Sequence, residues 1–399
     1  MIPLEVNNKI VRRRDTTNPT SNGMSKTRIE IKILLASIFV LVILYVAWVR
    51  PVAFQYDTNI PAPEKVEKKV VHTITPEPVK ALYMTSYVAA VPTWREKILK
   101  LIDDTELNAL VIDIKDYTGV NVLERAPDIA DFIEELHKHN VYVIGRVSVF
   151  QDQQYVREHP EYAVRRKDNG DLPAGEAGVW RDRKGIAWLD PSSHEVWDYI
   201  VGIARNSYYK LGFDEINFDY IRFPSDGDMS NVYYEYSSTS ASVSKSDKMK
   251  SFYKYLDQEL RSESIPISAD LFGMTTTNTD DLGIGQVLEN ALMHFDYVSP
   301  MVYPSHYPPT FNGWANPNKV PYEIVNFSMI KAATRASLAS TSPYKLRPWL
   351  QDFDYGGDYG EAEVRAQIQA VYDAGLTSWM LWDPGVKYTP SALNPAIIE

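Results

Sequence analysis

The 399-residue chain contains no cysteine. This absence excludes disulfide bonds, thiolate zinc sites and a cysteine nucleophile, so an exported form of the protein would fold without disulfides. The GxSxG nucleophile elbow, the P-loop and the HExxH zinc motif are also absent. None of the seven histidines lies inward on a strand that the pattern predicts, and we expect no metal and no cofactor.

Positive charge is scarce beyond the first fifty residues. Residues 1–50 carry a net charge of +5, whereas the remaining 349 residues carry −16. An acidic body binds polyanions poorly, so nucleic acid is not an expected partner. Hydrophobic residues at 45% and aromatic residues at 12% exclude a disordered chain. The length allows one large domain with appendages or two ordinary domains.

One long hydrophobic run stands out, the seventeen residues ILLASIFVLVILYVAWV over residues 33–49. Its length is about that of one bilayer crossing. A cleaved signal peptide and a buried core helix are the alternatives, but the run ends at Trp48–Arg50 without a small-residue cleavage site. Basic residues precede it, so residues 1–32 are expected to form a cytoplasmic tail and residues 33–50 a single-pass anchor in the cell membrane. The rest of the chain is then extracellular.

Residues 51–79 contain five prolines and the charge run EKVEKK, which favours an extended linker. Beyond it, eight aliphatic and aromatic runs alternate with amphipathic helical patterns, as is typical of βα units. The runs begin at Ala81, Ala109, Val141, Gly212, Ile267, Asp296, Lys345 and Thr377. Eight units in about 300 residues predict an α/β fold, a closed (β/α)8 TIM barrel over residues 80–390. A doubly wound open sheet is the alternative, but its glycine-rich first turn is missing.

The spacing between these runs is uneven. From Val141 to Gly212 there are 71 residues and from Gly212 to Ile267 there are 55, against about 30 for several other units. The extra chain follows mostly the third and fourth strands, at the end where barrel enzymes build their sites. We expect the first insertion to form part of a substrate wall.

Alternation along each strand separates inward from outward side chains. On the fourth strand, Ile216 and Phe218 are expected to face the helices, so Asp219 faces the interior near the carboxyl end. The same reasoning turns Asp270 inward on the fifth strand. The side chains that we predict to bind substrate, by their inward position or their place beyond a strand end, are Asp113, Lys115, Arg146, Arg222, Tyr303, Trp349, Gln351 and Trp382.

Two carboxylates on neighbouring strands meet the requirement of glycoside hydrolysis, in which one protonates the leaving oxygen and the other attacks the anomeric carbon or activates water. Asp219 is predicted to be the nucleophile or base, because Arg146 and Arg222 can keep it charged. Asp270 is predicted to be the acid, because apolar neighbours raise the pKa of a carboxyl group. The inward aromatic rings suit the apolar faces of sugars.

Four stretches carry a resemblance to a known family. NALVIDIKDYTG, LHKHNVYVIGRVSVFQD, WLDPSSHEVWDYIVGIA and GFDEINFDYIRFP are similar to a bacterial family of glycoside-hydrolase-like proteins, catalogued largely as a domain of unknown function and related in pattern to amylase-like barrels. The resemblance covers about residues 80–385. It implies a (β/α)8 fold, a polysaccharide or cell-wall glycan substrate, and Asp219 as a catalytic candidate. The chain departs from the amylase-like pattern at Asn217, where an arginine is usual, and at Asp270, where glutamate is usual.

Two functions remain open from the sequence: a membrane-tethered glycosidase, or a barrel that binds glycan at the cell surface without cleaving it. The deeper inward acids have an alternative role, because interior acids of barrels often form structural ion pairs. Such pairs are expected between Asp113 and Lys115 and between Glu215 and Arg146.

Overall fold

The structure is a computed structural model that describes residues 34–45, 70–169, 178–238 and 243–396. The chain divides into two compact units, residues 1–67 and residues 68–399. In the first unit residues 34–45 are helical, and the predicted membrane crossing continues past both ends of this described segment. Within the described ranges, no helix is both long enough and apolar enough to cross a membrane. The predicted basic tail lies outside the described residues, as does most of the predicted linker.

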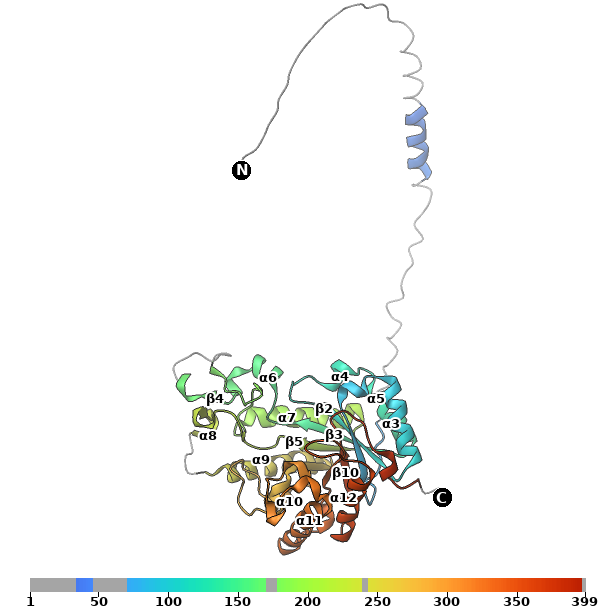
Figure 1. Ribbon diagram of the computed structural model, residues 1–399. Coiled ribbons are helices and arrows are strands. Elements are labelled where there is room, and N and C mark those ends of the chain that lie inside the picture. The colour runs from blue at the N-terminus through green and yellow to red at the C-terminus, as the bar shows by residue number, and fades with distance from the viewer. Residues whose placement is uncertain (1–33, 46–69, 170–177, 239–242, 397–399) are drawn as a thin grey trace, which may run out of the picture. The chain divides into compact units, whose positions relative to one another are not determined.

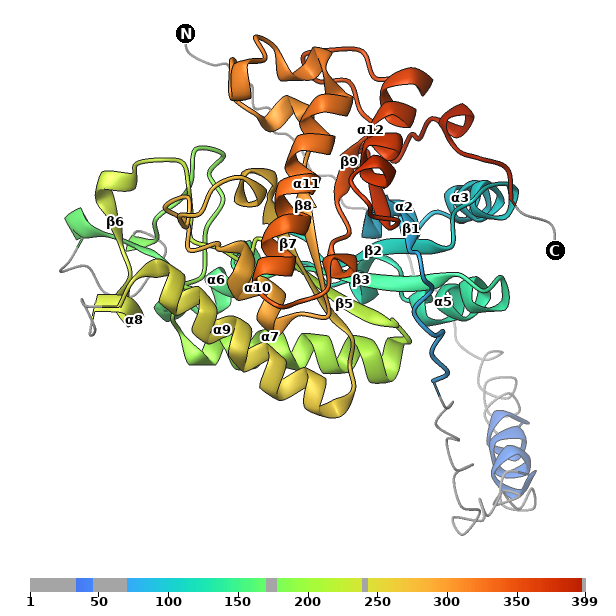
Figure 2. The same ribbon diagram turned by 90° about the horizontal axis from the view of Figure 1, so that it is seen from below.

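The second unit is built on a closed barrel of eight parallel strands (Figures 1 and 2). The barrel strands are β1 (Lys80–Met84), β2 (Ala109–Lys115), β3 (Tyr142–Ser148), β5 (Glu215–Asp219), β7 (Ile267–Phe272), β8 (Tyr297–Met301), β9 (Trp349–Gln351) and β10 (Trp379–Trp382). Around the barrel their order is β1-β10-β9-β8-β7-β5-β3-β2. Each expected strand run overlaps one of them, so the prediction of a (β/α)8 barrel is confirmed and the open sheet is excluded.

A helix covers the outside of the barrel after each of the first seven barrel strands. These helices are α3 (Pro92–Asp104), α5 (Ile129–Lys138), α7 (His194–Asn206), α9 (Lys245–Leu260), α10 (Leu288–His294), α11 (Pro321–Leu338) and α12 (Glu361–Asp373). Side-chain caps begin two of them, because the hydroxyls of Ser193 and Ser244 accept backbone N–H bonds at the starts of α7 and α9. A π-helical turn, Ser207–Leu211, extends α7 and ends at Gly212, whose φ of 92° favours glycine and lets the chain turn toward β5.

Smaller helices and strands lie in the connections at the carboxyl end of the barrel. They are the helices α2 (Ser86–Ala89), α4 (Val122–Arg125), α6 (Gln153–Glu158) and α8 (Glu235–Ser238), and the strands β4 (Arg165–Arg166) and β6 (Val232–Tyr233). β4 comes from the long connection after β3 and pairs antiparallel with β6 from the connection after β5. The two insertions are thereby joined above strands β3 and β5.

Apolar side chains form two separate layers, one between strands and helices and one inside the barrel. The outer layer includes Ile216 and Phe218 of β5 and Ala269 of β7. The inner layer consists of Val79, Ala81, Tyr83, Ala109, Val111, Tyr142, Ile144, Tyr303, Trp349 and Met380. The alternation along β5 and β7 therefore has the predicted phase, and the acidic residues of these strands point inward.

The last ten residues of the predicted linker, 70–79, lie against the barrel. The backbone N–H of Thr73 donates to Asp214 across 2.8 Å, and the Thr75 hydroxyl donates to Tyr142 across 3.0 Å. The ring of His72 stacks on Tyr208 at 3.8 Å. These contacts place the start of the globular body near residue 70, ahead of the first strand.

Candidate active site

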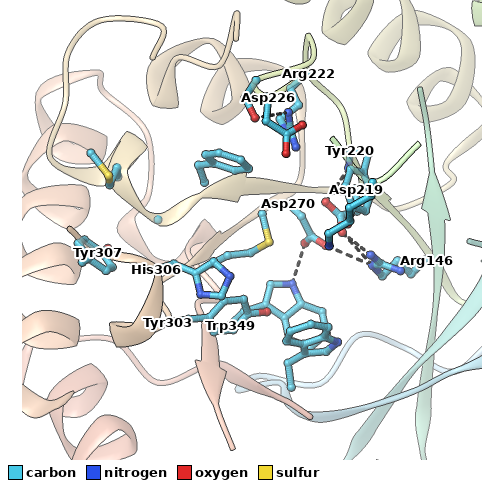
Figure 3. Close-up of a pocket in the computed structure, with 17 residues that line it drawn as sticks. Arg146, Asp219, Tyr220, Arg222, Asp226, Asp270, Tyr303, His306, Tyr307 and Trp349 are labelled. Carbon is cyan, nitrogen blue, oxygen red and sulfur yellow. Dashed lines mark hydrogen bonds and ion pairs between the residues drawn. The ribbon is translucent and has the colours of Figure 1, made fainter. Parts of the chain in front are cut away.

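A cavity of about 450 Å³ opens at the carboxyl end of the barrel strands (Figure 3). Strands β3, β5 and β7 contribute Arg146, Asp219 and Asp270 to its lining. Strands β9 and β10 contribute Trp349 and Trp382. Both predicted catalytic residues thus line one cavity, as do five of the eight residues predicted to bind substrate. A cavity of this size can hold a small number of sugar rings.

Arg146 is the centre of the site's electrostatics. Its Nη1 lies 2.6 Å from Oδ1 of Asp113, and its Nε lies 3.1 Å from Oδ2 of Asp219. Nη2 also donates to that Asp219 oxygen. The Nε atom is 3.8 Å from Oδ2 of Asp270. One cation therefore serves three carboxylates, and the buried cluster is short of positive charge.

Asp270 is the carboxyl group best suited to hold a proton. Its side chain is buried, and its Oδ1 accepts bonds from Asn217 Nδ2 at 2.9 Å and from Trp349 Nε1 at 2.8 Å. Burial raises the pKa of Asp270 well above the ordinary value, and the neighbouring charge of Asp219 raises it further. The other oxygen, Oδ2, has no comparably short hydrogen bond among the described residues, so it is the atom from which a proton can be given.

Asp219 has the opposite surroundings. The Arg146 guanidinium donates to its Oδ2, and the backbone N–H of Tyr220 donates to its Oδ1 at 2.6 Å. Such donors stabilise a carboxylate anion. Tyr220 has a φ of 49°, a left-handed conformation that a bulky residue rarely adopts and that often marks a functional site. This backbone turn at the end of β5 aims an N–H group at the carboxylate.

The two acids lie close enough to act on one glycosidic bond. Because Arg146 Nε is 3.1 Å from one Oδ2 and 3.8 Å from the other, the Oδ2 atoms of Asp219 and Asp270 are at most about 6.9 Å apart. Retaining glycosidases have carboxyl groups roughly 5 Å apart, and inverting enzymes roughly 6.5 to 9.5 Å apart. The upper limit of about 6.9 Å excludes most of the carboxyl separations that are found in inverting enzymes.

Aromatic rings line the wall opposite Arg222 and Asp226 (Figure 3). Tyr303 stacks on Trp382 with ring centroids 5.4 Å apart. Trp382 is half-buried and presents part of its ring to the cavity, as a sugar platform requires.

Three residues predicted to bind substrate lie outside the cavity lining, and the predicted ion pairs need correction. Asp113 pairs with Arg146 at 2.6 Å, and Lys115 pairs with Asp152 at 2.7 Å in a separate buried site. The pairing of β2 with β3 has an irregular register between Asp113 and Lys115, and the lysine does not pair with Asp113. Gln351 is buried and bonds to the backbone of Ser305 and Phe353.

The remaining expected pair is also different in the structure. Glu215 pairs with Arg347 at 2.8 Å, deep in the barrel, and accepts a bond from Tyr142. Arg146 does not pair with Glu215 and instead contacts Asp219 and Asp270 at the mouth of the barrel. Alternation identified the inward side chains, but which inward partners meet depends on their height along the barrel axis.

Several cavity residues were not found by sequence reasoning. Most lie on connections, where strand alternation does not apply, and two, Phe272 and Met301, are the last residues of β7 and β8. These cavity residues are Lys184, Tyr220, Ser225, Asp226, Phe272, Gly273, Met274, Met301, His306 and Tyr307. Lys184 comes from the insertion after β3, so this insertion contributes to the lining of the cavity. Burial lowers the pKa of His306, and nearby Lys184 lowers it further.

The described residues offer no group of three or more histidine or acidic side chains that could hold a metal ion. Where three acids do converge, the Arg146 guanidinium contacts each of them. This guanidinium balances negative charge of the three acids that would otherwise attract a metal ion.

A family model described as "Putative glycosyl hydrolase domain" matches residues 81–388. No curated protein sequence matches the chain. Among solved structures, the α-L-fucosidase isoenzyme 2 of Paenibacillus thiaminolyticus is 12% identical with a TM-score of 0.50, over 79% of this chain and 47% of that one. This likeness supports the barrel fold.

Two further solved structures are similar. A hypothetical protein from Ruminiclostridium thermocellum ATCC 27405 is 28% identical with a TM-score of 0.40, over 51% of this chain and 98% of its own. The spore cortex-lytic enzyme SleL of Bacillus megaterium QM B1551 is 12% identical with a TM-score of 0.47, over 79% of this chain and 72% of its own.

Proposed function

The chain belongs to the family of the Putative glycosyl hydrolase domain, and on this premise we propose that Asp219 and Asp270 are its catalytic pair. Membership of this family confirms the prediction of a glycosidase fold and class. The observation that carries the proposal is the shared contact of both acids with Arg146, which brings them to one cavity while their surroundings differ. Two neighbouring carboxyl groups with different surroundings, one of them buried with a raised pKa, are the usual mark of an acid and a nucleophile.

In the proposed reaction, Asp270 gives its proton from Oδ2 to the glycosidic oxygen as the bond to the anomeric carbon breaks. Asp219 attacks that carbon and forms a glycosyl ester. Asp270, now a carboxylate, then takes a proton from water, and the resulting hydroxide cleaves the ester and restores Asp219. The short separation of the two Oδ2 atoms is the reason for proposing this retaining course over an inverting one.

The test is release of reducing ends from a panel of wall and capsule polysaccharides. The Asp219→Asn and Asp270→Asn variants should each lose at least about a hundredfold in kcat/KM, because each lacks one half of the acid and nucleophile chemistry. Asp104→Asn, at the exposed end of α3, is the matched control and should retain activity. Proton NMR of the first product should show the anomeric configuration of the substrate.

Cleavage that survives both active-site substitutions would contradict the assignment. Binding of glycan by the wild-type chain, without cleavage of any member of the panel, would instead support the alternative of a non-catalytic glycan-binding barrel.

We further propose that the enzyme is tethered to the cell membrane, with the barrel outside the cell acting on a polysaccharide or cell-wall glycan. Support comes from the apolar run over residues 33–49, the basic residues before it, and the exposed apolar side chains of the described helical segment 34–45. Protease added to intact cells should digest the barrel and spare the amino-terminal segment. A barrel that is protected until the cells are lysed would overturn this topology.

A further inference from the structure

Arg222 is a buried cation on the cavity wall whose donors are only partly used. Its side chain lines the cavity, and the residue is 8% exposed. Nη1 donates to the carbonyl of Phe223 at 3.0 Å and to the hydroxyl of Ser225 at 3.2 Å. Among the described residues, Nε and Nη2 of Arg222 have no hydrogen-bond partner, yet neither atom is fully enclosed. One edge of the guanidinium therefore keeps two parallel donors accessible.

Aromatic rings hold this guanidinium in place. Its Cζ lies 4.9 Å from the ring centroid of Trp188 and 4.6 Å from that of Phe272. The ring of Tyr220 lies 5.7 Å away. A guanidinium fixed among rings loses little conformational entropy when it binds a ligand, and its planar edge matches the two oxygens of a carboxylate.

The charge of Arg222 is poorly compensated within the described part of the chain. No carboxylate there lies within 4 Å of it, whereas Arg146 has three such neighbours. Burial lowers the pKa of Arg222, which is the expected response of a cation removed from water without a close counter-ion. An anion bound at the accessible edge would supply the missing partner.

The other charged groups of the cavity limit what this anion can be. Lys184, on the exposed insertion, adds a third cation to the lining beside Arg222 and Arg146, whereas Asp226 adds a negative charge beside Arg222. A carboxylate carries one negative charge and is tolerated near Asp226 better than a phosphate, which carries nearly two. The short fork of Arg222 also fits a planar carboxylate well.

We propose that the substrate is an acidic glycan and that Arg222 holds the carboxylate of one of its sugars. This inference deepens the proposed function and rests on it, because it names the substrate class of the same site. The carboxylate can belong to a uronic acid ring or to a carboxyl-bearing ether substituent on an amino sugar. Asp219 and Asp270 would act on the glycosidic bond while Arg222 selects the charged residue on the far wall.

The test measures binding separately from cleavage, using the full-length chain in detergent with Asp219→Asn to prevent turnover. The probes are tetragalacturonate and the disaccharide of N-acetylglucosamine and N-acetylmuramic acid, each beside its carboxyl-reduced form. At least one acid probe should bind about tenfold or more tightly than its reduced form, as expected for hydrogen bonds to a charged group. Which of the two binds identifies the source of the carboxylate.

Arg222→Gln, added to this protein, should abolish the preference, and Arg222→Lys should weaken it because lysine keeps the charge and loses the fork. Arg157→Gln, on the exposed surface of α6, is the matched control and should retain it. The comparison of acid and reduced probes needs no substitution at Arg222. It therefore decides whether the site prefers a carboxylate even if Arg222→Gln fails to fold.

Equal binding of acid and reduced probes, absence of binding by both acid probes, or a preference that survives Arg222→Gln would each overturn the inference. These outcomes are distinct from failure of the hydrolase proposal. Cleavage of neutral glycans alone by the wild-type chain would leave the hydrolase standing and reject the acidic substrate. Acid-selective binding without cleavage of any glycan would support the acidic ligand and reject the hydrolase proposal.

Discussion

The indole Nε1 of Trp349 on β9 donates a hydrogen bond to Oδ1 of Asp270 on β7 across 2.8 Å. Strand alternation predicted Trp349 as a residue that binds substrate, and it does line the cavity, but the residue is only 2% exposed. The ring is therefore mainly a positioning group. Its hydrogen bond orients the proposed acid and leaves Oδ2 to face the substrate.

The substitution Trp349→Phe should move the alkaline limb of the activity profile to higher pH. The indole bond lowers the pKa of Asp270 against the larger raising effect of burial, so its removal raises that pKa and keeps the acid protonated longer. The measurement is kcat/KM against pH. Trp314→Phe, away from the cavity, should leave the profile unchanged. A limb that stays in place would show that the indole does not tune Asp270.

Replacing Arg146 by methionine should destabilise the fold by about 3 to 5 kcal/mol near neutral pH, because the carboxylates of Asp113, Asp219 and Asp270 lose the cation that they share. Without Arg146 these acids hold protons more tightly in the folded state than in the unfolded state, so the unfolding free energy of the variant falls as pH rises. Denaturant unfolding at pH 5 and pH 7 tests this, with the larger loss expected at pH 7.

The matched control for this substitution is Arg205→Met, in which the lost ion pairs with Glu259 and Glu263 are partly exposed. It should cost about 1 kcal/mol or less. Equal losses for the two variants would show that the Arg146 cluster contributes no more than a surface network.

Trp382→Ala should weaken glycan binding about tenfold while the protein remains folded, because the half-buried ring offers a stacking surface to sugars. Trp379→Ala is the informative comparison, since Trp379 on the same strand is fully buried in the outer layer and its loss should cost about 3 to 5 kcal/mol. Thermal melting and glycan titration separate the two effects. Early melting with unchanged affinity in Trp382→Ala would make that ring part of the core.

Asp190 should make the fold less stable as pH rises from about 4 to 6. Burial raises its pKa to about 6, above the value of roughly 3.9 in the unfolded chain, so the folded state holds a proton that the unfolded state has released. The unfolding free energy should fall by up to about 3 kcal/mol across this window. In Asp190→Asn the decrease in unfolding free energy across this window should be smaller by that amount. An unchanged decrease would remove Asp190 as its source.

Strand alternation was sufficient to place the acids, because a period of two leaves only two phases and the apolar residues select one. Ile216 and Phe218 face the helices, so Asp219 faces inward. The same phase is right for Asp270. Alternation did not predict the partner of Lys115, which pairs with Asp152 beyond an irregular register between Asp113 and Lys115.

The sequence by itself determined the barrel, its eight strands and the inward direction of both acids, since these follow from short-range periodicity. Only the tertiary structure decided which inward groups meet. Arg146 takes Asp219 as a partner, and Glu215 takes Arg347, 132 residues away along the chain. Pairing of this kind depends on the height of each side chain within the closed barrel and on connections such as the one that carries Arg222. No local pattern encodes either of these, because both are set when the strands close around a common axis.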